Sequence, residues 1–335
     1  MERLTDTYNY YLTVADKRLE NRFGMGGILS PIGTIAIYSI LLITIRKFME
    51  NRKPYELKTF MLLYNIFQVV ASFYNSFELI YLAIKMRYSL TCEPVNYSDE
   101  PLPTRMAYAM HFYYVLKVVD LTDTIVFALR KKTSQITFLH VFHHVSMILN
   151  SWAGIKWVPG GQSFLSCSLN SFIHGVMYSY YGLSSMGSAI QKYLWWKKYI
   201  TQMQLIQFFC VIIHCYVNLQ QTECTYPRGF SYGSIGYAFL LALLFLNFYR
   251  DLLAPFLFII VVEYVTKQAE VGFSYLTHKG KQQHLTRKLR NSSTQIERKI
   301  SDLDFAYDIA LLENDPKKSE QQLSSYSENA KKVGL

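Results

Sequence analysis

Three histidines stand close together in one apolar stretch of the chain, at His140, His143 and His144. Their i, i+3 and i+4 spacing places the three imidazoles on one face of a helix. Histidines at membrane depth are costly, so the pattern indicates a function that faces the interior of a helix bundle. A neutral imidazole in a dry site can act as a nucleophile or a general base. Packing alone is the weaker explanation for all three.

Ionisable residues also interrupt the apolar stretch 106–129, which contains Lys117, Asp120 and Asp123. Facing lipid, these charges would be strongly unfavourable, so they must pair with one another or line a wet cavity. A buried ion pair that only fixes helix packing is the alternative, and it does not exclude a function.

Polar stripes mark two further apolar stretches. Asn170, His174 and Tyr178 follow one another at i, i+4 and i+8, and Gln204 and Gln207 share one stripe of a later stretch. Such stripes either line a site or hydrogen-bond neighbouring helices to one another.

Metal binding by the imidazoles is not expected. Membrane di-iron desaturases and hydroxylases also carry an HxxHH box, but they need several such boxes. The chain has eight histidines, and four of these lie near predicted lumenal span ends or in the tail, namely His111, His214, His278 and His284. The four that remain are too few for two irons, which leaves metal-free acyl transfer as the alternative chemistry.

Membrane helices must position these residues. Hydrophobic residues make up 51% of the 335, and runs of about 18 or more apolar residues recur, each able to cross a hydrocarbon core as a helix. The sequence predicts an all-α polytopic membrane protein with seven transmembrane helices. These spans cover about residues 26–45, 60–84, 106–129, 136–153, 164–185, 200–219 and 232–249.

Basic residues predict the orientation. Lys and Arg crowd the loop between the first two spans, and Arg130 opens a basic triplet after the third, so both loops are expected in the cytosol. The N-terminus is then lumenal and the C-terminus cytosolic. The formal charge of +10 falls mainly at span ends, and no nucleic-acid partner is expected.

Four regions follow from this topology. They are a lumenal N-terminal segment at 1–25, the seven-span domain at 26–250, an extra apolar interfacial run at 251–265, and a polar cytosolic tail at 266–335. The extra run is interrupted by Pro255 and is too short to span a membrane comfortably.

The polar residues of four predicted spans lie at similar depths in the membrane. Counted from the cytosolic end of each span, the histidine box and the polar residues of the other three helices lie roughly 6–20 Å deep. This predicts a buried chamber that is entered from the cytosol.

Two cysteines and a sequon lie in the predicted lumenal loops. Because the lumen is oxidising, Cys92 and Cys224 are predicted to form a disulfide, with two unrelated loop thiols as the alternative. Asn96 opens the sequon Asn-Tyr-Ser, a predicted glycosylation site.

Four motifs together resemble the ELO family of very-long-chain fatty acid elongases, over about residues 8–250. They are HVFHH, the pattern from Lys117 to Lys132, the pattern from Asn170 to Tyr181, and TxxQxxQF from Thr201 to Phe208. Asp120 stands where the family usually has Glu.

The resemblance implies a 3-ketoacyl-CoA synthase (a transferase) of the endoplasmic reticulum membrane that condenses a fatty acyl-CoA with malonyl-CoA. It implies six helices in a ring around an acyl tunnel, with the first span outside. No cofactor is expected beyond the two CoA substrates. Membrane lipid and the ketoacyl reductase, dehydratase and enoyl reductase of the elongation cycle are the expected partners, and homo-oligomerisation is left open.

Roles for individual residues follow from the resemblance. His143 would form an acyl-histidine intermediate, tuned by His140 and His144, while His174 and Asn170 bind the malonyl group or an oxyanion. The expected substrate-binding residues are Lys117, Asp120, Asp123, Arg130, Asn170, Tyr178, Gln204 and Gln207. Two alternatives stay open: a histidine that acts only as general base, and a non-catalytic transporter or scaffold.

Overall fold

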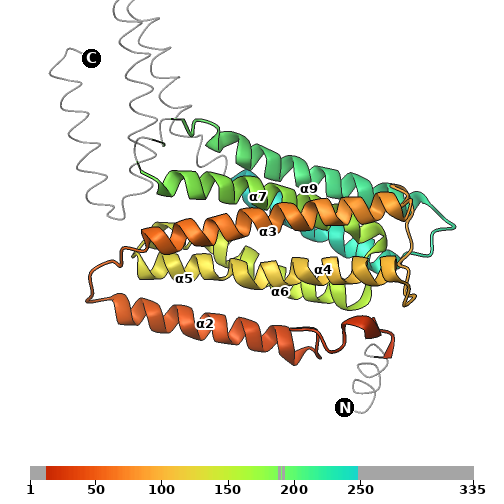
Figure 1. Ribbon diagram of the computed structural model, residues 1–335, viewed down its shortest axis with the longest axis horizontal. Helices are drawn as coiled ribbons and strands as arrows, with labels where there is room; N and C mark the ends of the chain where they lie inside the picture. Colours follow the sequence, from red (N-terminus) through yellow and green to blue (C-terminus); the bar gives the residue numbers. More distant parts are fainter. Residues whose placement is uncertain (1–12, 188–189, 191–192, 248–335) are drawn as a thin grey trace, which may run out of the picture. The chain divides into compact units, whose positions relative to one another are not determined.

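The computed structural model describes residues 13–187, 190 and 193–247, and regular structure in this part of the chain is helical (Figure 1). Its α-helices are α2 (Leu29–Met49), α3 (Lys58–Lys85), α4 (Pro101–Asp120), α5 (Thr122–Leu129), α6 (Phe138–Trp157), α7 (Phe164–Ser185), α9 (Lys197–Gln220) and a further helix over Arg228–Asn247. Short 3₁₀ turns are η1 (Lys17–Leu19), η2 (Thr133–Gln135) and η3 (Gly161–Ser163). The regions predicted at 251–265 and 266–335 lie outside the described residues.

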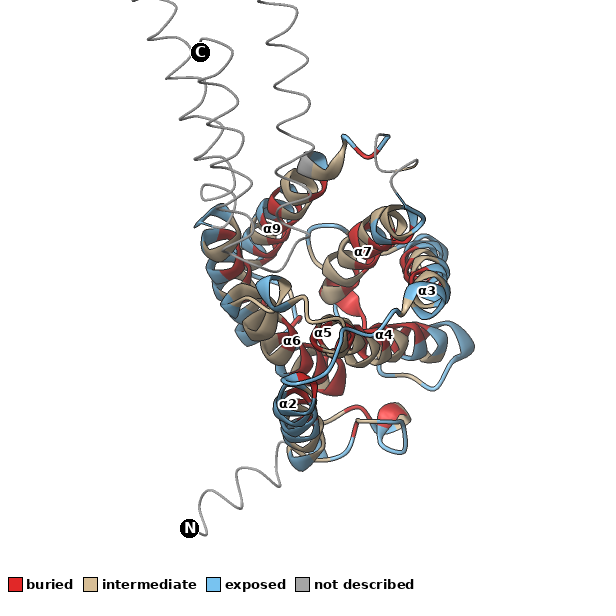
Figure 2. Cartoon of the chain, turned by 90° about the vertical axis from the view of Figure 1, so that its left-hand side faces the viewer, coloured by how far each residue is buried: buried red, intermediate tan, exposed pale blue. Residues whose placement is uncertain are grey.

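All described residues except Lys131–Gln135 belong to one compact unit. Within it, α3 packs against α4 and α7, α4 packs against α6, and α7 packs against α9. Helix α2 contacts α5 and α6 and leaves its opposite face uncovered, as the end-on view in Figure 2 shows.

Several helices have the length and composition of membrane spans. Those that meet both criteria in the described residues are α2, α3, the Tyr199–Gln220 part of α9, and Arg228–Asn247. On α2, Leu29, Ile40 and Ile43 are 79%, 63% and 68% exposed. An uncovered row of such side chains is unfavourable in water and favourable in lipid. The chain is therefore a multi-pass membrane protein.

The predicted third span, over 106–129, is wrong as a single helix. It is divided at Leu121 into α4 and α5, which follow one another along nearly the same line (Figure 1). The Leu121 N–H donates to the Val118 carbonyl three residues back, at 3.3 Å. The Tyr64 hydroxyl donates to the Val119 carbonyl at 3.3 Å and competes with the N–H that a continuous α-helix would bring there. Such 3₁₀ turns inside helices often mark functional segments.

Small and polar residues bring α3 and α7 close together. The Asn75 amide donates to the Ser171 hydroxyl at 3.0 Å, and the Ser76 hydroxyl donates to a backbone carbonyl of α7 at 2.9 Å. A Cβ atom on Gly175 would come within 2.9 Å of the Phe73 ring. Close approach through small residues, with hydrogen bonds across the seam, is how helices associate in membranes. The seam fixes the rotation of α3 against α7, and α7 carries the predicted site residues Asn170, His174 and Tyr178.

Loops cover the end of the bundle where α3 finishes and α4 begins, which we call the loop end. A disulfide joins Cys92 to Cys224, the pair that the sequence predicts. The Gln162 side chain accepts the Glu93 N–H at 2.9 Å, and its amide nitrogen donates to His214 Nε2 at 2.8 Å. These contacts hold the loops across the helix ends.

Candidate active site

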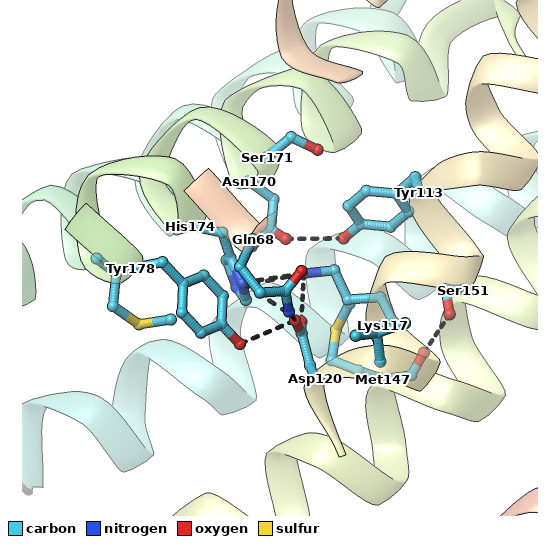
Figure 3. Close-up of polar contacts among 12 residues, drawn as sticks. Gln68, Tyr113, Lys117, Asp120, Met147, Ser151, Asn170, Ser171, His174 and Tyr178 are labelled. Atoms are coloured by element: carbon cyan, nitrogen blue, oxygen red, sulfur yellow. Dashed lines mark hydrogen bonds and ion pairs between the residues drawn. The ribbon is translucent and has the colours of Figure 1, made fainter. Parts of the chain in front are cut away.

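A lysine, an aspartate and a histidine form a buried cluster between α4 and α7 (Figure 3). Lys117 Nζ donates to Asp120 Oδ2 at 3.0 Å and lies 3.2 Å from His174 Nδ1, which is itself 3.4 Å from Asp120 Oδ2. All three residues are buried. An ammonium group only donates, so a ring nitrogen of His174 accepts from it, which requires a neutral imidazole. The charges in this span were expected to pair with one another or to line a wet cavity, and Lys117 and Asp120 form an ion pair.

Asp120 receives two further hydrogen bonds. Gln68 Nε2 of α3 donates to Asp120 Oδ1 at 2.6 Å, and the Tyr178 hydroxyl donates to the same oxygen at 2.9 Å (Figure 3). The sequence analysis did not single out Gln68. The signal that could have found it is a stripe of polar residues on α3, all buried: Asn65, Gln68, Ser72, Asn75 and Ser76.

Two more predicted residues adjoin the cluster. Asp123 lies in the first turn of α5, just after the break at Leu121, and its Oδ2 is 2.7 Å from the Tyr178 hydroxyl of α7. Asn170, one helical turn before His174 on α7, accepts the Tyr113 hydroxyl on its Oδ1 at 3.0 Å. Both contacts join α7 to the polar side chains of α4 and α5.

The histidine box begins in the first turn of α6. Thr137 caps this helix, and its hydroxyl accepts the His140 N–H at 3.2 Å. Thr124 Oγ1 of α5 lies 2.9 Å from His140 Nε2 and accepts the Tyr38 hydroxyl at 3.0 Å. The Thr124 hydroxyl thus bonds to Tyr38 and to the His140 ring at once, which holds that ring in place.

The three rings of the box lie in one group that faces the cluster. The ring centroids of His140 and His144 are 4.3 Å apart, and those of His143 and His144 are 5.7 Å apart. His143 also interacts electrostatically with Lys117 and Asp120. The box and the buried ion pair therefore occupy the same interior.

Other predicted residues lie apart from this group. Gln204 Nε2 is 3.9 Å from Met177 Sδ, Gln207 is buried on α9, and Arg130 ends α5. No hydrogen bond or ion pair in the described part of the chain joins these three to Asp120. Asn96 is exposed in the loop that carries Cys92, and its side-chain oxygen accepts the N–H of Ser98 at 2.9 Å.

Two further histidines, His111 and His214, lie outside the site. His111 Nε2 contacts the Phe23 carbonyl at 2.8 Å, and His214 contacts Gln162 at the loop end. Among the described residues, no group of three or more His, Cys, Asp or Glu side chains is arranged to hold a metal ion.

The arrangement supplies the parts that acyl transfer needs. Neutral imidazoles can attack a carbonyl carbon or accept a proton, and an ammonium group held in place can stabilise an oxyanion. Asp120 keeps that ammonium fixed, and Asn170 lies on α7 one turn before His174.

Known proteins resemble this chain over most of its length. The family model described as ELO, the GNS1/SUR4 family, matches residues 24–253. "Very long chain fatty acid elongase 4" of Homo sapiens is 42% identical over 252 residues, covering 73% of this chain and 79% of the relative. "Very long chain fatty acid elongase 7" of Rattus norvegicus is 42% identical over 72% of this chain and 87% of the relative. The protein of that name from Drosophila melanogaster is 40% identical over 75% and 78%.

Proposed function

Because this chain belongs to the ELO (GNS1/SUR4) family, we propose that it condenses a long-chain fatty acyl-CoA with malonyl-CoA. The products are a 3-ketoacyl-CoA, CO₂ and CoA. Its relatives are named very long chain fatty acid elongases, and the chain is an enzyme of fatty acid elongation. The observation that supports the finer proposal is that the histidine box and the buried Lys117–Asp120 pair share one interior, where His143 interacts electrostatically with both charges.

The first half-reaction is acyl transfer to His143. The neutral ring nitrogen attacks the thioester carbonyl, the C–S bond breaks, and CoA leaves as a thiolate. The acylated imidazolium loses its ring proton, which ends on the thiolate, so acyl-imidazole and CoASH form with protons in balance. His140 and His144 orient the nucleophile, since Thr124 fixes the His140 ring and His140 lies against His144.

The second half-reaction is decarboxylative condensation. The bond from the malonyl methylene carbon to its carboxylate breaks and gives CO₂ and an enolate, whose carbon attacks the acyl carbon. The C–N bond to His143 breaks, and the ring takes up one proton to return to neutral imidazole. Lys117, His174 and Asn170 stabilise the enolate oxygen. One proton is consumed in each turnover.

CoA recognition falls to residues nearer the helix ends. Arg130 attracts CoA phosphates, and Gln204 and Gln207 of α9 contact the substrate. Asp123 and Tyr178, also expected from the sequence to bind substrate, are assigned instead to positioning Asp120, because the Tyr178 hydroxyl contacts both carboxyl groups.

The disulfide supports the proposed topology. Disulfides persist in oxidising compartments, so the loop end that carries Cys92 is assigned to the lumen of the endoplasmic reticulum, with a glycan on Asn96. The histidine box opens α6, just after Arg130, and is then reached from the cytosol. We assign seven spans to residues 26–250, six of them around an acyl tunnel. The segment 1–25 is then lumenal, the run at 251–265 interfacial and the tail at 266–335 cytosolic.

The reaction as written uses no cofactor or metal, only acyl-CoA and malonyl-CoA drawn from water and membrane lipid. Its product needs a ketoacyl reductase, a dehydratase and an enoyl reductase to complete a cycle. We propose these enzymes as partners, with a second copy of the chain as a further partner to be tested.

Purified full-length protein, incubated with acyl-CoA and labelled malonyl-CoA, tests the function. The expected result is labelled 3-ketoacyl-CoA that requires both substrates. The matched control is His111→Ala, which removes a histidine outside the site and should keep the activity. Folded wild-type protein that forms no labelled 3-ketoacyl-CoA would overturn the proposal.

A further inference from the structure

The Tyr178 hydroxyl lies between two carboxyl groups. It is 2.9 Å from Asp120 Oδ1 and 2.7 Å from Asp123 Oδ2. A phenol carries one proton and can donate to only one of these oxygens. The other contact is a hydrogen bond only if the carboxyl group itself supplies the proton. One of the two aspartates is therefore a neutral acid that donates to Tyr178.

The partners of each carboxyl group decide which one is neutral. Asp120 receives N–H groups from Lys117 at 3.0 Å and from Gln68 at 2.6 Å, and these hold it in the ionised form. Asp123 has no ion pair with a basic group in the described part of the chain. Electrostatics place the extra proton on Asp123, which donates to Tyr178, which in turn donates to Asp120.

The chain of hydrogen bonds runs inward from a partly exposed group. Asp123 is half-buried, whereas Tyr178 and Asp120 are 1% and 3% exposed. Beyond Asp120, the bonds continue to Lys117 and His174 (Figure 3). A carboxyl group that is not fully buried is thus linked through one buried hydroxyl to Asp120, Lys117 and His174.

The proposed condensation needs such a link, because it consumes one proton per turnover inside a closed site. We propose that Asp123 and Tyr178 form a proton relay that delivers this proton through Asp120 and the Lys117–His174 pair to the ring nitrogen of His143, which takes it up when its C–N bond to the acyl group breaks. This inference rests on the proposed function. Asp123 gives its proton to Tyr178 as Tyr178 passes its own to Asp120, and Asp123 is then reprotonated from water. Both are positioning residues that act through Asp120.

Several other groups face Asp123 and would influence its protonation. They are Tyr38 of α2, Tyr64 of α3, Lys117 and Asp120 of α4, and Tyr178 and Tyr181 of α7. The only cation among them is already paired with Asp120, so it does not hold Asp123 ionised.

Asp123→Asn separates a relay from a structural lock. An amide N–H still donates to Tyr178, so the packing contact is kept, but an amide cannot pass on a proton. The first half-reaction balances its protons internally, so the amount and rate of CoA released with acyl-CoA alone should stay as in wild type. Condensation with malonyl-CoA should slow at least about tenfold. Formate buffer should restore the rate with rising concentration, because a small acid can replace the missing carrier.

Two further variants complete the experiment. Tyr178→Phe should show the same split between the half-reactions, while Glu56→Gln, at a side chain that is 85% exposed, should match wild type. Wild-type condensation in Asp123→Asn, equal loss of both half-reactions, or no rescue by formate would each overturn the relay alone. Wild-type protein that makes no 3-ketoacyl-CoA would overturn the relay and the proposed function together.

Discussion

Polar side chains are buried both at the loop end and in the site, but their partners differ. At the loop end, Gln162 bonds to backbone groups and to one neutral ring, and a disulfide joins the covering loops. In the site, Asp120 accepts hydrogen bonds from Lys117, Gln68 and Tyr178, and the His174 imidazole contacts both members of the ion pair.

The network at the loop end therefore closes the bundle, whereas the network in the site can take part in a reaction. A network of neutral donors and acceptors has one favourable proton arrangement and can only hold a shape. A network in which carboxylates, imidazoles and an ammonium group share protons has several, which is what proton transfer requires. Substitutions that change one network at a time test this difference.

Removing the charge of Asp120 should have the largest effect. Asp120→Asn leaves Lys117 buried without a counter-ion, which should cost about 3–5 kcal/mol of stability. The rate of 3-ketoacyl-CoA formation should fall at least about 100-fold. Thermal unfolding and the labelled malonyl-CoA assay measure the two effects.

An ion pair outside the site is the matched control for Asp120. Arg105 pairs with Glu78 across α3 and α4, and its side chain is 52% exposed. Arg105→Gln leaves the buried Glu78 carboxyl group without its cation, so it should also lower stability, but it should leave the activity unchanged. Equal losses of activity in the two variants would contradict the distinction between site and scaffold.

Removing the disulfide at the loop end should lower the stability of the fold without lowering the rate of the reaction. Replacing both Cys92 and Cys224 with Ser should lower the unfolding free energy by about 2–4 kcal/mol. The protein that remains folded should keep its CoA release. Reductant should lower the Tm of wild type by a similar amount, and Cys210→Ser, at an exposed free thiol, is the control. A double variant with an unchanged Tm would show that the bridge does not stabilise the fold.

The seam between α3 and α7 offers a third test, of intermediate size. Gly175→Ala places a methyl group within 2.9 Å of the Phe73 ring, and overpacking of this kind costs about 1–3 kcal/mol. Gly154→Ala is the control, because no atom lies within 4 Å of its added Cβ. Because the seam positions Gln68, activity should fall with Gly175→Ala. Equal stability of the two variants would mean that the seam can relax.

The smallest effect is expected at Glu93, in the loop that carries Cys92. Burial raises the pKa of this carboxyl group above its ordinary value, although the Ser89 N–H that it accepts opposes the shift. The fold therefore loses stability as pH rises from the unfolded pKa through the raised folded one. Glu93→Gln keeps an oxygen for Ser89 and cannot ionise. It should be more stable than wild type at pH 7, by less than about 0.5 kcal/mol, and the gap should close toward pH 4.

If the stability advantage of Glu93→Gln over wild type widened toward pH 4, folding would lower the pKa of Glu93 and not raise it. The matched control is Glu56→Gln, which changes a carboxyl group on an exposed loop and should show no such pH dependence.

Sequence periodicity predicted the helices that carry the site better than it predicted their contacts. The stretch predicted at 164–185 is α7 with the same bounds, and the box lies in the first two turns of α6 as its spacing required. The break at Leu121 was missed, because it depends on Tyr64 reaching a carbonyl 55 residues away.

The hydrogen-bond partners of the site residues could not be predicted from the sequence either. Tyr38 reaches Thr124, and Gln68 reaches Asp120, across separations of 86 and 52 residues. Hydropathy shows which face of a helix is polar, but it does not give the rotation of one helix against the next. That rotation depends on seam contacts such as Gly175 against Phe73, which only the folded chain reveals.

The most direct test of the central claim is incubation of the purified protein with acyl-CoA alone. The account predicts release of about one equivalent of CoA per site, with one acyl group added to the peptide that contains His143. His143→Ala should abolish both signals, and His111→Ala should keep them. A normal CoA burst in His143→Ala, or turnover by wild type without any acylated His143 peptide, would contradict the acyl-histidine and leave histidine as a general base.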